Sequence, residues 1–183
     1  MSTYHHGDLR SALLQAAGDL LEEQGLGALS LREAARRAGV SHNAPYRHFP
    51  DRNALLAALA AEGFRRLGEA MEEKSGRERG EAYVRFALAH PNRFRLMFGG
   101  QIDFGTHPEL RAAAAATYDG LLASFRARAD VANPELAAAA AWSLTHGLAH
   151  LLLDGHFREG REREDFVREV IGAVRFAAGQ RAA

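Results

Sequence analysis

The segment from Ser30 to Arg52, SLREAARRAGVSHNAPYRHFPDR, constrains the fold more than any other part of the chain. Ser30 is a good N-cap residue, and a glutamate follows three positions later, at the spacing of a capping box. Gly39 follows the apolar positions of this first helix, where a helix end favours a residue that tolerates positive φ. Ser41 then predicts the N-cap of a second helix, from His42 to Phe49. The segment therefore predicts a helix-turn-helix, whose second helix enters the major groove of DNA.

Local charge and polar groups in this segment also favour contact with DNA. Five arginines stand against two acidic residues between positions 30 and 52, which gives a local charge of +3. We predict that Arg32, His42 and Asn43 read base edges, because asparagine can form paired hydrogen bonds with adenine. Four further residues are predicted to contact phosphate: Ser30, Tyr46, His48 and Arg52. Ser41 and Arg47 complete the predicted DNA-binding set.

Pro45 interrupts the second predicted helix. Proline has no N–H and disfavours helical geometry in the residue before it, which is Ala44. We therefore expect a distorted or partly 3₁₀ start to this helix. The alternative for the whole segment is a surface helical hairpin with solvated arginines, but the coincidence of cap, turn glycine and polar N-terminus favours DNA binding.

The stretch LSLREAARRAGVSHNAPYRHFPDRNALLAAL resembles the DNA-binding domain of the TetR family of transcriptional regulators. The shared pattern is a capping Ser or Thr, then A-x-x-A-G-V-S, then Y-x-H-F, then a basic residue that opens the next helix. The opening YHHGDLRSALLQAA and the later WSLTHG resemble one subgroup, which has a Trp-His-Gly motif in its C-terminal domain. The resemblance implies a one-component regulator, a repressor, that binds a palindromic operator as a dimer. It also implies that a small, largely apolar ligand releases the repressor by shifting the helix after the helix-turn-helix.

Bulk composition is compatible with this function but does not demand it. The 183 residues predict one or two small domains, and 23 Lys and Arg balance 23 Asp and Glu. Overall neutrality counts against DNA unless charge is segregated, as it is in residues 30–52. The chain has no cysteine, which excludes a disulfide framework and a thiolate metal site and is compatible with the cytoplasm, where we expect the protein. Unbroken apolar runs are far shorter than 18 residues, so we expect no membrane span or signal peptide.

Apolar residues recur at helical spacing along the chain, and no stretch alternates as a strand. We predict an all-α chain with a three-helix helix-turn-helix domain over residues 1–52 and a ligand-binding and dimerisation domain over residues 53–183. About nine helices are expected, at residues 8–24, 31–38, 42–49, 51–74, 77–90, 92–98, 108–128, 134–154 and 165–178. Asp51 should cap the helix at 51–74, which should link the two domains, and Asn133 should cap the helix at 134–154, with Pro134 at its first position.

Aromatic residues in the second domain suggest a ligand pocket. A buried core explains most of the ten phenylalanines, but a lining of Phe, Met, Trp and Tyr with some His also suits an apolar ligand. TetR-like proteins carry such a pocket in the C-terminal domain, so the resemblance favours a ligand. The candidate lining is Phe86, Phe94, Met97, Phe98, Tyr118, Trp142 and His146.

His146, His150 and Asp154 recur every four residues and should share one helix face. Two histidines at this spacing can chelate a metal, so a metal-binding protein or an enzyme is one alternative. The sequence HGLAH lacks the glutamate of a metalloprotease motif, and the chain has no phosphate-binding loop or nucleophile elbow. We therefore expect no enzyme, no bound metal and no cofactor. A helical adaptor that binds protein instead of DNA is the other alternative.

The last two long helices carry more apolar surface than one face can bury. One stripe runs through Phe166, Val170, Val174 and Ala177, and the preceding helix adds a leucine-rich face around Leu151. Surplus apolar surface on terminal helices predicts a homodimer packed as a four-helix bundle. A two-fold dimer with two reading heads would bind half-sites about one DNA turn or a multiple apart.

Overall fold

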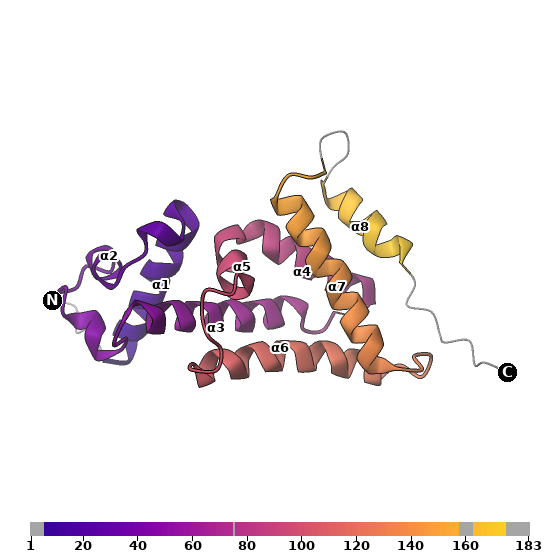
Figure 1. Cartoon of the computed structure of the whole chain (residues 1–183), viewed down its shortest axis with the longest axis horizontal. Coiled ribbons are helices and arrows are strands. Elements are labelled where there is room, and N and C mark those ends of the chain that lie inside the picture. The colour runs from indigo at the N-terminus through magenta and orange to yellow at the C-terminus, as the bar shows by residue number, and fades with distance from the viewer. Residues whose placement is uncertain (1–5, 75, 158–162, 175–183) are drawn as a thin grey trace. The chain divides into compact units, whose positions relative to one another are not determined.

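The computed structural model describes residues 6–74, 76–157 and 163–174, and every regular element within these ranges is a helix (Figure 1). This confirms the all-α prediction. The described residues form eight α-helices and two short 3₁₀ helices: α1 (His6–Gln24), η1 (Leu26–Ala28), α2 (Leu31–Arg37), η2 (Ala44–Arg47), α3 (Arg52–Met71), α4 (Gly76–Ala89), α5 (Pro91–Phe98), α6 (Pro108–Arg126), α7 (Pro134–Leu153) and α8 (Arg163–Ala173). Of the nine predicted helices, the one at residues 42–49 is instead the short 3₁₀ helix η2.

The chain divides into two compact units. The N-terminal unit contains the described residues up to Phe64 together with His90–Ala114, and the C-terminal unit contains Arg65–Ala89 and the described residues from Ala115 onward. The sequence predicted a boundary after residue 52. The observed boundary differs because the first part of α3, α5 and the start of α6 pack with the helix-turn-helix, which residue order alone does not reveal.

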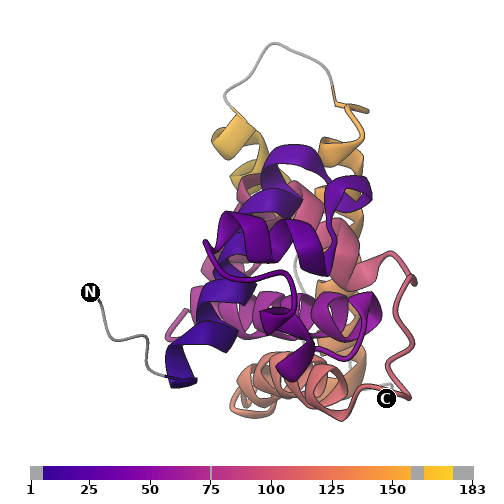
Figure 2. The same ribbon diagram turned by 90° about the vertical axis from the view of Figure 1, so that its left-hand side faces the viewer.

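In the N-terminal unit, α1 packs against α2 and α5 around a core that includes Leu13, Leu20 and Leu55 (Figure 2). The predicted caps form: Ser30 Oγ accepts a hydrogen bond from the Glu33 N–H at 3.1 Å, and Asp51 Oδ1 accepts one from the Ala54 N–H at 2.8 Å. These side chains satisfy N–H groups that have no partner within the helix. The capping box is incomplete, because the Glu33 carboxylate binds Arg36.

The start of α5 is bound to α1 by polar contacts. Glu22 accepts hydrogen bonds from the backbone N–H groups of Asn92 and Arg93 at 3.2 and 3.0 Å, and the Asn92 side chain donates to the Glu22 carbonyl at 3.1 Å. Arg93 is only 4% exposed, and its Nη1 lies 3.9 Å from Glu62 Oε2. A Cβ on Gly18 would clash with Arg93 Nη2, so glycine there makes room for the guanidinium.

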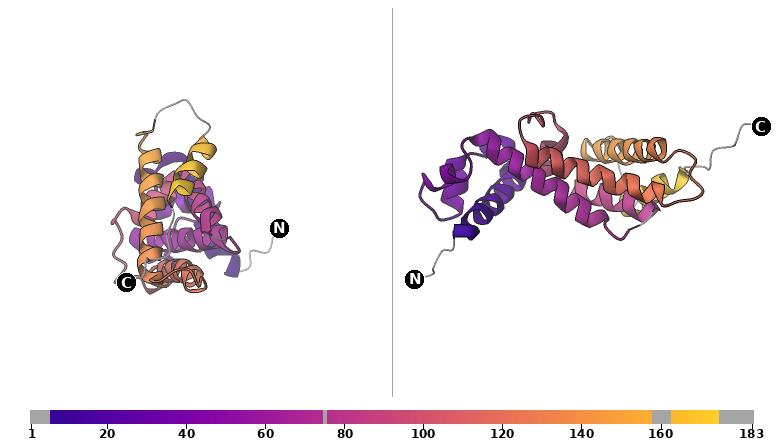
Figure 3. Two further views of the ribbon diagram at one scale, coloured as in Figure 1. Left: turned by 90° about the vertical axis from the view of Figure 1, so that its right-hand side faces the viewer. Right: turned by 90° about the horizontal axis from the view of Figure 1, so that it is seen from below.

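In the C-terminal unit, α4 packs against α7 and α8 around Val84, Leu148, Leu152, Val167 and Ile171. Figure 3 shows α7 and α8 side by side, in agreement with their direct contacts. The predicted start of α7 is confirmed, since Asn133 Oδ1 accepts a hydrogen bond from the Leu136 N–H at 3.0 Å. The predicted end of α8 at residue 178, and Ala177 of its apolar stripe, lie outside the described residues.

Among the residues that the structure describes, α7 is long and apolar enough to cross a membrane. The mean hydropathy over 18 residues of this helix is 1.4, and 28% of that stretch is buried. No such segment was expected, because the unbroken apolar runs of the sequence are short. Alanine and leucine raise the average of α7 although histidines interrupt the runs. Its buried residues pack against α4 and α8, as in a helical bundle.

Candidate nucleic-acid interface

The second element of the helix-turn-helix is shorter than predicted. Its regular part is the 3₁₀ helix η2, its N-cap position is Asn43 rather than Ser41, and no side chain makes a cap hydrogen bond. The Ala44 N–H donates to the Ser41 carbonyl at 3.0 Å, whereas Pro45 has no N–H with which to continue an α-helix. The expectation of a distorted start was right, but the α-helix from His42 to Phe49, capped by Ser41, was wrong.

The segment presents polar side chains to solvent and apolar ones to the core. Pro45 and Phe49 are buried, and they fix the segment against the N-terminal unit. The exposed side chains include most of those proposed to contact DNA: Ser41, His42, Asn43, Tyr46 and Arg47. His48 is half-buried. A segment packed inward would have been incompatible with DNA recognition, and this one faces outward.

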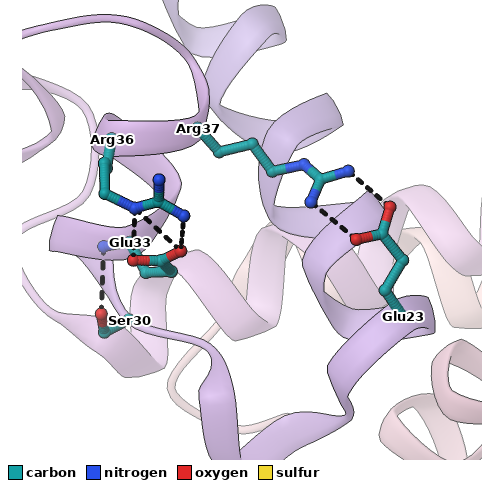
Figure 4. Close-up of polar contacts among 5 residues, drawn as sticks. All are labelled: Glu23, Ser30, Glu33, Arg36 and Arg37. Atoms are coloured by element: carbon teal, nitrogen blue, oxygen red, sulfur yellow. Dashed lines mark hydrogen bonds and ion pairs between the residues drawn. The ribbon is translucent and has the colours of Figure 1, made fainter.

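Two of the three arginines of α2, Arg36 and Arg37, bind acidic side chains (Figure 4). Arg36 Nε donates to Glu33 Oε2 at 3.0 Å, and Arg37 Nη1 donates to Glu23 Oε2 at 2.7 Å. These hydrogen bonds lower the pKa of Glu33 and of Glu23. Glu33 is already counted in the local charge of +3, and adding Glu23 lowers that charge to +2. Glu23 was missed because it precedes the segment that was counted.

Two residues proposed to contact phosphate also stabilise the fold. Ser30 caps α2, and Arg52 donates from Nε to the Leu29 carbonyl at 2.8 Å and from Nη2 to the Leu26 carbonyl at 2.7 Å. These bonds join the start of α3 to the turn before α2. Arg32, the remaining proposed base reader, is exposed on the first turn of α2.

The candidate ligand-lining residues fall into two groups, one in each unit. Phe94 and Met97 are buried in the N-terminal unit, where Phe98 packs 4.9 Å from Phe94 between ring centroids. The other four belong to the C-terminal unit: Phe86, Tyr118, Trp142 and His146. Within it, the rings of Tyr118 and Trp142 lie 5.6 Å apart, and those of Trp142 and His146 lie 6.1 Å apart.

Tyr83 joins this second group and was not among the candidates. Its Oη lies 2.8 Å from His146 Nδ1 and accepts a hydrogen bond from Trp142 Nε1 at 3.3 Å. Burial raises the pKa of Tyr83, so the phenol stays protonated and can donate to His146. Burial also lowers the pKa of His146, with a smaller contribution from His150, which favours the neutral imidazole as acceptor. Only the spacing of Tyr83 three residues before Phe86 hinted at a shared face.

The His146, His150 and Asp154 face gains no support as a metal site. The rings of His146 and His150 are 4.6 Å apart between centroids. Within residues 6–74, 76–157 and 163–174, no group of three His, Cys, Asp or Glu side chains could hold a metal ion.

Comparison with known proteins identifies the family. Residues 13–59 match the family model described as bacterial regulatory proteins, tetR family, and residues 77–174 match the tetracyclin repressor-like C-terminal domain. The chain belongs to the TetR family. It is a DNA-binding transcriptional regulator and not an enzyme. The subgroup suggested by WSLTHG stays a prediction.

Solved structures agree with this assignment. A protein of unknown function from a Rhodococcus species is 38% identical over 94% of this chain and 94% of that chain, with a TM-score of 0.77. The TetR family transcriptional regulator PfmR from Thermus thermophilus is 24% identical, covers 87% of this chain and 94% of that chain, and has a TM-score of 0.58. The multidrug binding protein EbrR, solved with imidazole, is 24% identical over 100% of this chain and 96% of that chain, with a TM-score of 0.63. The last two matches show the fold alone.

Proposed function

We propose that this TetR-family regulator is a cytoplasmic repressor that binds a palindromic operator as a homodimer and is released by a small, largely apolar ligand. The observation that carries the proposal is the outward-facing segment around η2 within the region that matches the family's DNA-binding domain. Buried Pro45 and Phe49 hold the segment, so its exposed polar side chains are available to a DNA groove.

We assign base reading to Arg32, His42 and Asn43. These side chains are exposed. Ser41 and Arg47 lie in the same outward-facing segment. Phosphate contacts are assigned to Ser30, Tyr46, His48 and Arg52, with Ser30 and Arg52 acting in addition to their contacts within the fold. Arg36 and Arg37, which are paired with carboxylates, are not among the assigned contacts.

The proposal is tested by separating base reading from phosphate contact. Asn43→Ala should relax preference at one operator position, because an asparagine pairs with one base. Tyr46→Phe should weaken binding to all sequences alike, since it removes only a donor to phosphate. Binding-site selection with randomised duplexes measures both effects, and Asn53→Ala, an exposed asparagine outside the segment, is the control for base preference. An unchanged selection profile for Asn43→Ala would refute the base-reading assignment.

The apolar exposed side of α7 supports the homodimer. Leu136 is 68% exposed and Leu151 is 42% exposed, and a Cβ on Gly147 would meet nothing within 4 Å. A second copy could therefore approach α7 closely and cover these leucines. Leu151→Glu should place a charge in this interface, and sedimentation velocity should then show monomers with much weaker operator binding. A dimer unaffected by Leu151→Glu would place the interface elsewhere.

The Tyr83, Trp142 and His146 cluster supports a ligand site in the C-terminal unit. It combines aromatic surface with a few polar atoms, which suits a largely apolar ligand that needs orientation. EbrR, a multidrug binding protein, has the same fold, and this likeness adds modest support. We expect the ligand to act by shifting α3, and a tenfold change in operator affinity corresponds to about 1.4 kcal/mol of coupling. A thermal-shift screen of metabolites, repeated with operator DNA, would identify ligands whose effect the operator opposes.

A further inference from the structure

A cavity of about 240 Å³ lies entirely within the N-terminal unit. Its lining comes from α1, from the corner between η2 and α3, from α3 itself and from the start of α6. Every lining residue belongs to the same compact unit as residues 41–49, which we call the recognition segment. The cavity is therefore separate from the ligand site proposed for the C-terminal unit.

The floor of the cavity is apolar and is formed by short side chains. Ala54, Ala57 and Ala58 share one face of α3, at positions i, i+3 and i+4, and Ala57 and Ala58 are buried. Phe49 and Leu110, which are also buried, line the cavity. Because a methyl group reaches only a short distance from the backbone, three alanines on one face leave space that longer side chains would fill.

The rim carries one arginine, two histidines and one glutamate. Arg10 Nη2 donates to Glu109 Oε2 at 3.0 Å, and the two side chains are 39% and 54% exposed. An ion pair this exposed contributes little, so another carboxylate can replace Glu109 at Arg10. The Arg10 guanidinium also lies 5.6 Å from the centroid of the Phe49 ring, which places the cation beside an aromatic wall. His48 and His107 supply further polar atoms, and both are half-buried.

We propose that this cavity binds a small aromatic carboxylate. The carboxylate would take the place of Glu109 on the Arg10 guanidinium, which presents paired N–H donors that match carboxylate geometry. The ring would lie on the alanine floor against Phe49, and the imidazoles of His48 and His107 would donate to the carboxylate. Ligand pockets commonly measure about 300–1,000 Å³, so this smaller cavity suits a ligand with a single ring.

Such a ligand would contact residues that hold the recognition segment. Phe49 is one of the two buried residues that fix the segment, and His48 is a proposed phosphate contact. Binding in the cavity would therefore change operator affinity. This consequence rests on the proposed function, whereas binding itself does not, and the two are measured separately.

Binding is tested on the full chain without DNA, by fluorine NMR with para-fluorobenzoate as the probe and para-fluorobenzyl alcohol as its uncharged counterpart. The wild type should bind the carboxylate saturably and at least about tenfold more tightly than the alcohol. Arg10→Met should lose this preference, and Ala57→Leu, which fills the floor, should lose both probes. Glu109→Gln should raise the affinity for para-fluorobenzoate, because it removes the carboxylate that competes for Arg10. Arg95→Met, an exposed arginine of the same unit outside the cavity lining, is the control and should bind as the wild type does.

Three results would overturn the proposal: no saturable binding, equal affinity for the two probes, or carboxylate binding that survives Arg10→Met. If Ala57→Leu fails to fold, as judged by circular dichroism, the Arg10→Met comparison decides alone. Operator affinity is then measured with and without para-fluorobenzoate. Failure of the wild type to bind any operator would count against the proposed function. Ligand binding in the cavity would still be decided by the NMR measurements alone.

Discussion

Glu22 caps a helix that it does not belong to, and removing its carboxylate should cost stability in a way that a neighbouring glutamate does not. Helix α5 begins at Pro91, which has no N–H, and its own N-cap, His90, makes no side-chain cap bond. The Glu22 carboxylate accepts from the next two N–H groups, those of Asn92 and Arg93. Glu22→Ala leaves both donors without this acceptor at a part-buried site.

The magnitude follows from two contributions. Loss of an N-cap acceptor costs about 1 kcal/mol, and loss of a negative charge at a helix N-terminus costs about 0.3–1 kcal/mol. Because the carboxylate accepts two bonds, we expect Glu22→Ala to lower the free energy of unfolding by about 2 kcal/mol. For a chain of this size, that corresponds to a fall in Tm of about 4–8 °C.

The assay is urea and thermal unfolding followed by circular dichroism, at fixed protein concentration. Glu23→Ala is the matched control, because Glu23 is the adjacent residue but its carboxylate binds Arg37 at an exposed site. It should change Tm far less than Glu22→Ala does, and Glu22→Gln, which keeps one acceptor oxygen, should be intermediate. Equal effects of the two alanine variants would refute the argument, since they would show that the cap at α5 contributes no more stability than the exposed Glu23–Arg37 pair.

The remaining predictions concern packing, a backbone contact and pH. Gly63→Ala should lower the free energy of unfolding by about 1–3 kcal/mol, because its Cβ would lie 2.6 Å from Met97 Sδ. Gly120→Ala is the control and should be neutral or stabilising, because its Cβ would meet nothing within 4 Å. Denaturant melts measure both variants. Arg52→Ala should cost about 1 kcal/mol or more through its two carbonyl partners, and stability equal to the wild type would leave phosphate contact as its only role. The depressed pKa of His146 means that the unfolded chain binds its proton first on acidification. Stability from this group is therefore present above the unfolded value near pH 6.5 and is lost as pH falls below it, so the melting temperature of His146→Phe should depend less on pH below about 6.5 than that of the wild type.

Much of the fold follows from local sequence. Helix periodicity predicted the all-α class, and caps at Ser30, Asp51 and Asn133 predicted three helix starts, because a cap side chain bonds to an N–H only a few residues away. Family membership was also evident from the helix-turn-helix pattern, and the comparisons confirm it. The recognition element was predicted less well, since Pro45 weakens the α-helix more than expected and leaves a 3₁₀ turn.

Contacts between distant residues were not predictable from one sequence. Glu22 caps a helix that starts at residue 91, Tyr83 meets His146, and Glu23 pairs with Arg37 across two helices. No local spacing records these pairs, because only the packing of helices brings the partners together. Local sequence was enough to predict which long segments are helical and where three of them begin, because periodicity and caps depend on residues close together in the chain. It also predicted the segment whose polar side chains are exposed. Helix packing decided which charges pair, that Gly18 makes room for the buried Arg93, and where three alanines leave a cavity.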